Sequence, residues 1–171
     1  DTLLLSGGLI PENELSRQAG LQMDPRTGGT MVFENMETSV PGIFACGNVV
    51  HVHDLVDYVS AESERAGRAA AAFLNTGKAA DGPILDILAG EGVSYTVPQR
   101  LRLGHTEQGT EIFFRVRRPY GKCRIAVTCG DTPVAAFSRQ RMAPGEMEHI
   151  RLPKQLPDSA ETLTITVEET G

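Results

Sequence analysis

The first half of the chain is interpreted from eleven residues, Thr38-Ser39-Val40-Pro41-Gly42-Ile43-Phe44-Ala45-Cys46-Gly47-Asn48. Pro41-Gly42 predicts a turn into the apolar run 43–45, which indicates a buried strand. Gly47 and Asn48 end this run, and a helical pattern begins a few residues later. A ligand can therefore meet the carboxyl end of a strand and the N-terminus of a helix together. Gly47 permits close approach of the backbone, and Asn48 offers a hydrogen-bond donor and an acceptor.

The flanking sequence predicts alternating strands and helices. Upstream we expect a strand covered on both faces at residues 2–5, a short helix at 12–19, and a hairpin pairing 21–23 with 31–33. Downstream we expect a long helix at 55–74, with Asp54 as its N-cap. Its buried face is predicted to carry mainly small residues at helical spacing, namely Val56, Val59, Ser63, Ala66, Gly67, Ala70 and Leu74.

From Val93 onward the apolar period changes to two, which is typical of strands. The candidate strands are Ser94–Leu103, Glu111–Val116, Cys123–Thr128, Val134–Arg139, Met147–Leu152 and Leu163–Glu168. Short strands at this spacing favour an antiparallel β-sandwich. The predicted fold class is α+β, with a first domain at 1–77, a linker with an apolar anchor at 78–92, and a β-sandwich domain at 93–171.

Composition excludes several classes of protein. The chain has 171 residues and a net charge of -6, so it has no general attraction for nucleic acid or anionic lipid. Arg115 and Arg117 are interpreted as a solvated strand face. Three cysteines without C-x-x-C spacing argue against a disulfide scaffold or a zinc site, and free thiols favour a cytoplasmic location. We find no signal peptide and no apolar run of ~20 residues, so no membrane insertion is expected.

The eleven-residue stretch resembles the second flavin-binding segment of the pyridine-nucleotide-disulfide oxidoreductase family, as found in thioredoxin reductases. The family pattern is roughly T-x-x-P-G-(I/V)-(F/Y)-A-x-G-D, and the chain departs from it at Asn48, where the family has Asp. The resemblance covers about residues 1–77. It implies the remnant of a doubly wound FAD-binding α/β domain, in which Gly47, Asn48, Val56 and Asp57 contact the cofactor.

The resemblance also implies an activity, namely hydride transfer between NAD(P)H and FAD in a full-length parent protein. The chain begins at Asp1 inside an apolar run, so we expect it to be a C-terminal fragment of that parent. The sequence holds neither of the family's G-x-G-x-x-G loops nor a redox C-x-x-C. We therefore expect the fragment alone to be inactive and to hold no FAD tightly. The alternative hypothesis is that the β-sandwich is an interaction module that docks a partner subunit or a second copy.

A cluster of His51, His53 and Asp54 forms an H-x-H-D pattern just after the motif. Two neutral imidazoles and a carboxylate are good metal ligands, and a histidine here can also transfer protons. Roles in the loop near the flavin or in helix capping are the preferred interpretation, so the predicted site includes no metal ligand. Cys46, inside the motif, is interpreted as a small apolar residue rather than a redox thiol.

Overall fold

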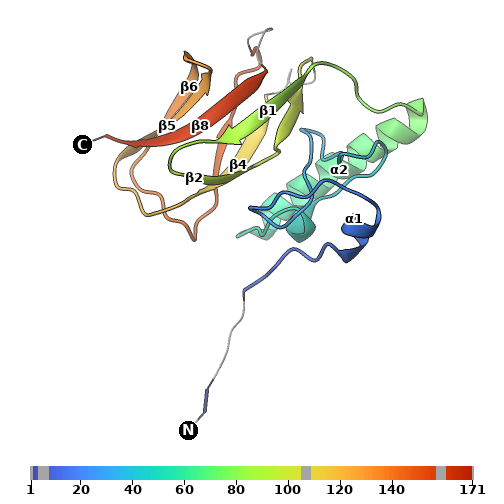
Figure 1. Cartoon of the computed structure of the whole chain (residues 1–171), viewed down its shortest axis with the longest axis horizontal. Helices are drawn as coiled ribbons and strands as arrows, with labels where there is room; N and C mark the ends of the chain where they lie inside the picture. The colour runs from blue at the N-terminus through green and yellow to red at the C-terminus, as the bar shows by residue number, and fades with distance from the viewer. Residues whose placement is uncertain (1, 4–7, 105–108, 157–160, 171) are drawn as a thin grey trace.

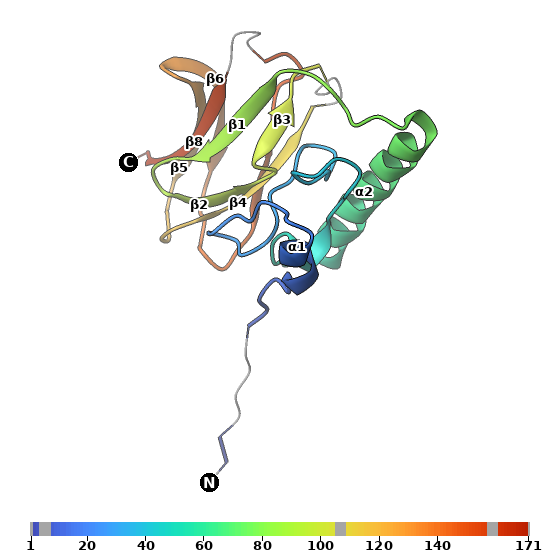
Figure 2. The ribbon, with the colours of Figure 1, turned by 45° about the vertical axis from the view of Figure 1, so that its right-hand side comes forward.

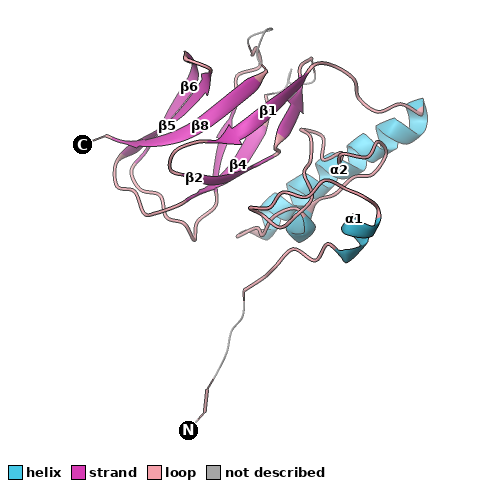
Figure 3. Cartoon of the chain, viewed as in Figure 1, coloured by secondary structure: helices cyan, strands magenta, loops and turns pink. Residues whose placement is uncertain are grey.

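The computed structural model describes residues 2–3, 8–104, 109–156 and 161–170. Helices come first along the chain: α1 (Glu14–Gln18), the 3₁₀ turn η1 (Gly47–Val49) and α2 (Val56–Thr76). The named strands follow: β1 (Ile84–Ala89), β2 (Val93–Val97), β3 (Arg100–Arg102), β4 (Glu111–Val116), β5 (Cys123–Cys129), β6 (Thr132–Arg139), β7 (Glu148–Arg151) and β8 (Thr162–Glu169). The α+β class is therefore confirmed, and Figure 3 shows the division between helices and strands.

The described strands form two sheets, one of five strands in the order β3-β1-β8-β5-β6 and one of three in the order β2-β4-β7. The three-stranded sheet is antiparallel. The five-stranded sheet is mixed, because β1 and β8 run parallel while its other pairs are antiparallel. The prediction of a purely antiparallel sandwich was therefore wrong, since strands far apart in sequence meet in the same direction.

One apolar core lies between the two sheets. Strand β8 shows the expected period of two, with Leu163, Ile165 and Val167 buried and the residues between them less so. From the other sheet, Ile112 and Phe114 of β4 enter the same cluster and are fully buried. Burial of apolar surface here drives the folding of this half of the chain.

Two segments of the β-rich half differ from the sequence prediction. The predicted strand 94–103 is divided into β2 and β3, which belong to different sheets. Pro98 interrupts it because proline lacks a ladder N–H, and the side chain of Gln99 bonds the backbone N–H of Val32 instead (3.0 Å). The apolar run 84–88, predicted as an anchor within the linker, is strand β1, whose Leu85 and Ile87 are buried in the core.

The first half contains less regular structure than predicted. Helix α2 is confirmed, and α1 covers only part of the predicted helix at 12–19. The hairpin is reduced to an isolated bridge, Met23 to Thr30, and the predicted strand 43–45 to another, Phe44 to Glu37. A strand requires backbone pairing with a neighbouring strand along its length. These segments pair at single positions and therefore form bridges. Thr2 and Leu3 are exposed and form no strand, while the rest of that predicted strand lies outside the described residues.

The three-stranded sheet is covered on both faces. One face meets the five-stranded sheet, and the other receives α2 and the loops of the first half, as Figures 1 and 2 show from two directions. A second apolar cluster joins Val32, Met36, Val50 and Ala66 to side chains of β2. None of the helices in the described ranges is both long and apolar enough to cross a membrane.

The predicted buried side of helix α2 is confirmed only in part, because Ala66 is buried and Val59 and Ala70 are half-buried. Glu62 and Ala66 are buried, whereas Val56 and Leu74, predicted to be buried, are 75% and 81% exposed. Glu62 and Ala66 are four residues apart and so lie on one side of the helix. That side faces the three-stranded sheet, and much of the small-residue side, including Ser63 and Gly67, is open to solvent.

Candidate functional site

The end of the eleven-residue motif forms the tight turn η1. Gly47 is buried and has a φ of 72°, a left-handed conformation that glycine adopts without steric penalty. Its backbone N–H donates to Oε2 of Glu62 at 2.5 Å, which ties the turn to α2. The neighbouring Asn48 is exposed, and its Oδ1 accepts from the backbone N–H of His53 at 3.3 Å. The motif therefore ends in a fixed backbone turn with a polar side chain at the surface.

Helix α2 begins without a side-chain cap among the described residues. Its N-cap is Leu55, which has extended backbone angles. Asp54, predicted as the N-cap, instead forms an ion pair with Arg115 and accepts from the backbone N–H of Met147 at 2.5 Å. An arginine on β4 is a stronger partner for this carboxylate than a helix N–H. The first-turn N–H groups, which start at Val56 and Asp57, are thus not capped by Asp54.

The four residues predicted to contact a cofactor lie on one short segment of the fold. Gly47 and Asn48 belong to η1, and Val56 and Asp57 to the first turn of α2. Gly47 is buried, and the other three are exposed. The structure thus places three of the four predicted positions at the surface. Their contact with a cofactor remains a prediction.

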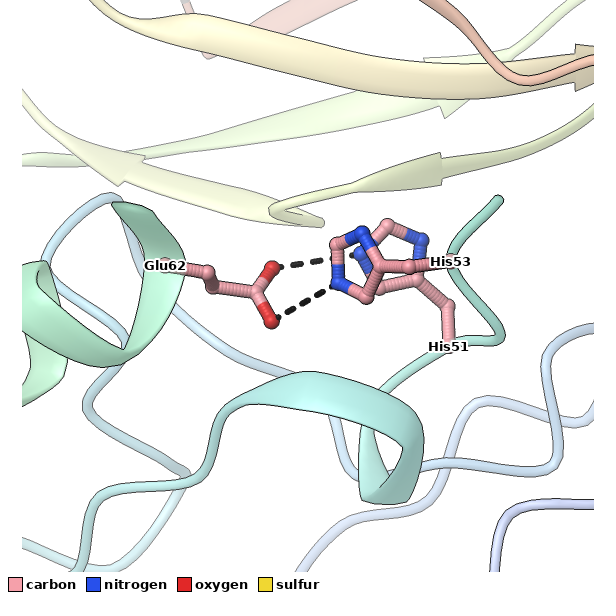
Figure 4. Close-up of side chains that lie close together, drawn as sticks. All are labelled: His51, His53 and Glu62. Carbon is pink, nitrogen blue, oxygen red and sulfur yellow. Dashed lines mark hydrogen bonds and ion pairs between the residues drawn. The ribbon is translucent and has the colours of Figure 1, made fainter. Parts of the chain in front are cut away.

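Between η1 and α2 lies a buried cluster of His51, His53 and Glu62, shown in Figure 4. The Nε2 atom of His51 is 3.2 Å from Oε1 of Glu62, and Nε2 of His53 is 3.1 Å from Oε2. All three side chains are at most 2% exposed. The two rings lie against each other, with centroids 4.2 Å apart, and both contact the ring of Phe113 on β4.

Protonation in this cluster follows from its contacts. Burial alone would raise the pKa of Glu62, but hydrogen bonds from His51, His53 and the Gly47 N–H outweigh it and lower that pKa to about 2. Burial lowers the pKa of His51, against the opposing effect of Glu62, and so favours its neutral form. An ionised carboxylate only accepts, so each Nε2 carries the proton it donates. The Nδ1 atoms of both rings are buried and have no hydrogen-bond partner in the described part of the chain.

The structure joins two of the three residues of the H-x-H-D pattern and replaces the third. Asp54 turns away to Arg115, and Glu62 takes its place beside the histidines. Glu62 was missed because it lies on the next helix. A signal was present, since a glutamate occupies the same helix side as Ala66, where an apolar residue is expected.

The interpretation of Arg115 as a solvated side chain was wrong. Its side chain is 16% exposed, and its guanidinium donates to the Val52 carbonyl at 3.1 Å and to the Tyr95 hydroxyl at 3.1 Å, in addition to pairing with Asp54. The loop before α2 covers the face of the sheet that carries Arg115. The period of two correctly indicated which face Arg115 occupies, but it could not predict that another segment packs on that face. Next to this arginine lies a cavity of about 240 Å³, which His51 and Val52 also line.

Comparison with known protein families agrees with the resemblance stated above. Residues 1–74 match the family model described as pyridine nucleotide-disulphide oxidoreductase, and the β-rich region that follows has no family match. Comparisons with curated proteins and with solved structures gave no significant match. The matched family is one of oxidoreductases that depend on flavin and NAD(P). The match includes the four predicted contact residues and the buried His–Glu cluster.

Proposed function

We propose that this chain supplies the C-terminal flavin-contacting segment of an FAD-dependent oxidoreductase, which transfers hydride between NAD(P)H and FAD. One observation carries the proposal. Within the residues that match the family, the buried Gly47 turn and the start of α2 lie on one segment tied together by Glu62, and no side chain in the described ranges caps that helix start. This is the pairing of a backbone turn with a helix N-terminus that an anionic cofactor requires.

Each of these residues has a defined role in the proposed site. FAD, when bound, accepts a hydride from NAD(P)H and carries the resulting negative charge near N1 and O2 of its ring. The backbone N–H groups of Val56 and Asp57 would stabilise that charge at the positive end of the helix dipole. Asn48, exposed beside them, would accept a hydrogen bond from a hydroxyl of the ribityl chain through Oδ1, which now accepts from His53.

Glu62 acts as a positioning residue in this proposal. Its carboxylate accepts from the Gly47 N–H and from both histidine rings, so it connects the turn, the following loop and the helix. Hydrogen bonds to an ionised carboxylate are stronger than those between neutral groups. The cluster thereby holds the turn and the helix start in a fixed relative position, which is the preorganisation that cofactor binding requires.

The chain itself supplies one part of a complete FAD site. The sequence has no G-x-G-x-x-G loop, so the pyrophosphate cradle and the nicotinamide site would come from polypeptide outside these 171 residues. The cradle makes several charge-assisted hydrogen bonds, each worth ~1.5–3 kcal/mol, and losing three weakens binding roughly a thousandfold or more. We therefore expect the 171-residue chain alone to bind FAD no tighter than the micromolar range in a calorimetric titration.

The test uses the whole open reading frame that encodes this chain. Purified, it should show flavin absorbance in the visible range and lose it on treatment with NAD(P)H. Val56→Pro removes one backbone N–H at the first position of α2, where proline is tolerated and where the extended Leu55 precedes it. We expect this variant to bind FAD about 10- to 100-fold more weakly, since one charge-assisted bond is lost.

Val56→Ala is the matched control, because it shortens the same exposed side chain and keeps the N–H. It should bind FAD as the parent does. A parent without flavin after gentle purification would contradict the proposed function. Equal FAD affinity of the proline and alanine variants would contradict the role given to the start of α2.

A second candidate function is docking through the β-rich half, which strand β6 favours. This strand of eight residues lies at the edge of the five-stranded sheet. An edge strand presents unpaired backbone groups to which another strand can add. If β6 docks a second copy, light scattering should show dimers, and Ala136→Lys on its exposed face should dissociate them. A wild-type chain that is monomeric at every concentration would contradict docking of a second copy.

A further inference from the structure

We propose that His51, His53 and Glu62 form a binding site for a divalent first-row transition metal ion of the zinc class. The inference is independent of the flavin function. One ligand atom from each residue, the imidazole nitrogens and a carboxylate oxygen, lies within 4.8 Å of the others, and all three side chains are buried. The donors come from two elements, the loop after η1 and helix α2, so an ion would cross-link them (Figure 4).

The spacing of the donors is close to that of a coordination sphere. The two nitrogen-to-oxygen separations are 3.1 and 3.2 Å, each to a different oxygen of Glu62, and one ligand atom from each residue lies within 4.8 Å of the others. Ligands about 2.0–2.1 Å from a tetrahedral ion are about 3.3 Å from one another. An ion can therefore take the place of the protons between the rings and the carboxylate with small movements of the side chains.

The chemistry of the donors selects the class of metal. Imidazole nitrogen suits zinc, iron, cobalt, nickel and copper, whereas magnesium and calcium prefer oxygen ligands throughout. The carboxylate of Glu62 is ionised and buried, and a divalent ion would neutralise its charge. His51 is held in the neutral form that a metal requires, because burial opposes its protonation. Two neutral imidazoles with one carboxylate are also the protein ligands of many zinc sites that keep one position open.

The surroundings of the cluster limit the affinity for an ion. A cavity of about 240 Å³ lies next to His51 and is also lined by Arg26 and Arg115, whose positive charge opposes a bound cation. Once Nε2 binds metal, the proton moves to Nδ1, and neither Nδ1 has a hydrogen-bond partner in the described residues. Ligands without such support typically bind 10–100-fold more weakly, so we expect moderate affinity.

Direct metal titration of the 171-residue chain tests the proposal. After EDTA treatment and desalting, calorimetry with Zn²⁺ should show about one equivalent bound. His53→Gln and Glu62→Gln should each weaken binding at least about tenfold, since each removes one of three ligands. His149→Gln is the matched control, because this histidine also contacts Phe113 but lies outside the cluster, and it should leave affinity unchanged.

A second measurement keeps the test decisive if a variant folds poorly. Nitrogen-15 NMR of the wild-type histidine rings should show Zn²⁺ shifting the Nε2 resonances of His51 and His53 and leaving those of His149 in place. Circular dichroism identifies variants that remain folded, and the comparison of affinities is restricted to those. A folded wild-type chain that takes up no Zn²⁺, or that shifts His149 in place of the pair, would overturn the proposal.

Discussion

The two halves of the molecule are stabilised in different ways. The β-rich half encloses a continuous apolar core between two sheets, to which β1, β4, β5 and β8 all contribute fully buried side chains. The first half has a small apolar cluster that includes Tyr95 and Val97 from β2. It buries charged groups instead, including Glu34, Glu37 and Glu62.

This difference indicates that the first half depends on the second. Polar contacts join them: Gln99 donates to Asp24 at 3.0 Å, and Arg102 on β3 pairs with Glu34 and Glu37. Buried charges stabilise a fold only while their partners remain in place. We therefore expect damage to the β-rich core to unfold both halves, and damage to the contacts between them to release the first half alone.

Phe114→Ala tests the shared dependence and has the largest expected effect. Phe114 is fully buried in the core between the sheets. Removing a buried phenylalanine side chain costs about 4 kcal/mol, because transfer energy is lost and a cavity remains. Urea denaturation followed by circular dichroism should show the loss as one transition that includes α2. If α2 keeps its stability in this variant, the first half does not depend on the β-rich core.

Arg102→Met breaks the contact between the halves. Arg102 is 7% exposed, lies 2.6 Å from Oε2 of Glu37 and stacks on the ring of Phe33. Methionine keeps much of the volume but leaves two buried carboxylates without a cation, at a cost of about 3–4 kcal/mol. Hydrogen exchange should show faster exchange in residues 30–45 than in β5 and β8. Arg68→Met, which breaks an exposed ion pair, is the control and should cost less than about 0.5 kcal/mol.

Local patterns in the sequence predicted the helices and strands better than they predicted which other segments these elements contact. The period of two located most strands, and helical spacing located α2. The inward side of α2 was predicted only in part. Ala66 was placed correctly, whereas Glu62 was missed because a charged residue interrupts the apolar stripe and pairs with groups outside the helix. For the same reason the parallel pairing of β1 with β8 was missed, since it joins residues about 76 positions apart.

The candidate site shows the same limit. The motif located the turn at Gly47 and the start of α2, whose contact with a cofactor remains a prediction. The H-x-H pattern identified two of the three clustered side chains. Asp54 was assigned to the helix because the two are adjacent in sequence, whereas its partner Arg115 lies on β4. Glu62 was missed because no motif includes it. Local motifs could therefore be predicted from the sequence. Contacts between residues far apart in the sequence could be identified only from the three-dimensional structure.

Lowering the pH should destabilise the first half of the chain because Glu62 becomes protonated. This is the third-largest effect that we expect. The pKa of Glu62 falls from 4.5 to about 2 on folding, so the ionised form stabilises the folded state. The contribution, up to about 3 kcal/mol, is present above pH 4.5 and is lost as the pH falls toward 2. His51 also destabilises the folded state as the pH falls below 6.5. Its pKa is lowered in the folded chain, so the unfolded chain takes up the proton more readily.

Urea denaturation in the presence of EDTA, repeated at several pH values, measures this contribution on the metal-free chain. Wild type should exceed Glu62→Gln in unfolding free energy near pH 6, and the difference should shrink as the pH approaches 2. Glu64→Gln, an exposed change on the same helix, should show no such pH-dependent difference. A gap between wild type and Glu62→Gln that stays constant with pH would mean that packing, and not charge, explains the loss.

The smallest change in stability is expected on the exposed side of α2, in contrast with its packed side. Leu74→Ser changes a side chain that is 81% exposed, so the unfolding free energy should change by less than about 0.5 kcal/mol. Ala66→Leu, on the side that packs against the sheet, should cost about 1–3 kcal/mol through overpacking.

Val56 and Leu74 lie on the open side, and exposed apolar side chains of this kind favour association. We therefore expect sedimentation equilibrium to show wild-type self-association that Leu74→Ser weakens, although it leaves stability nearly unchanged. A wild-type chain that remains monomeric at high concentration would show that the open side of α2 does not drive association of this chain.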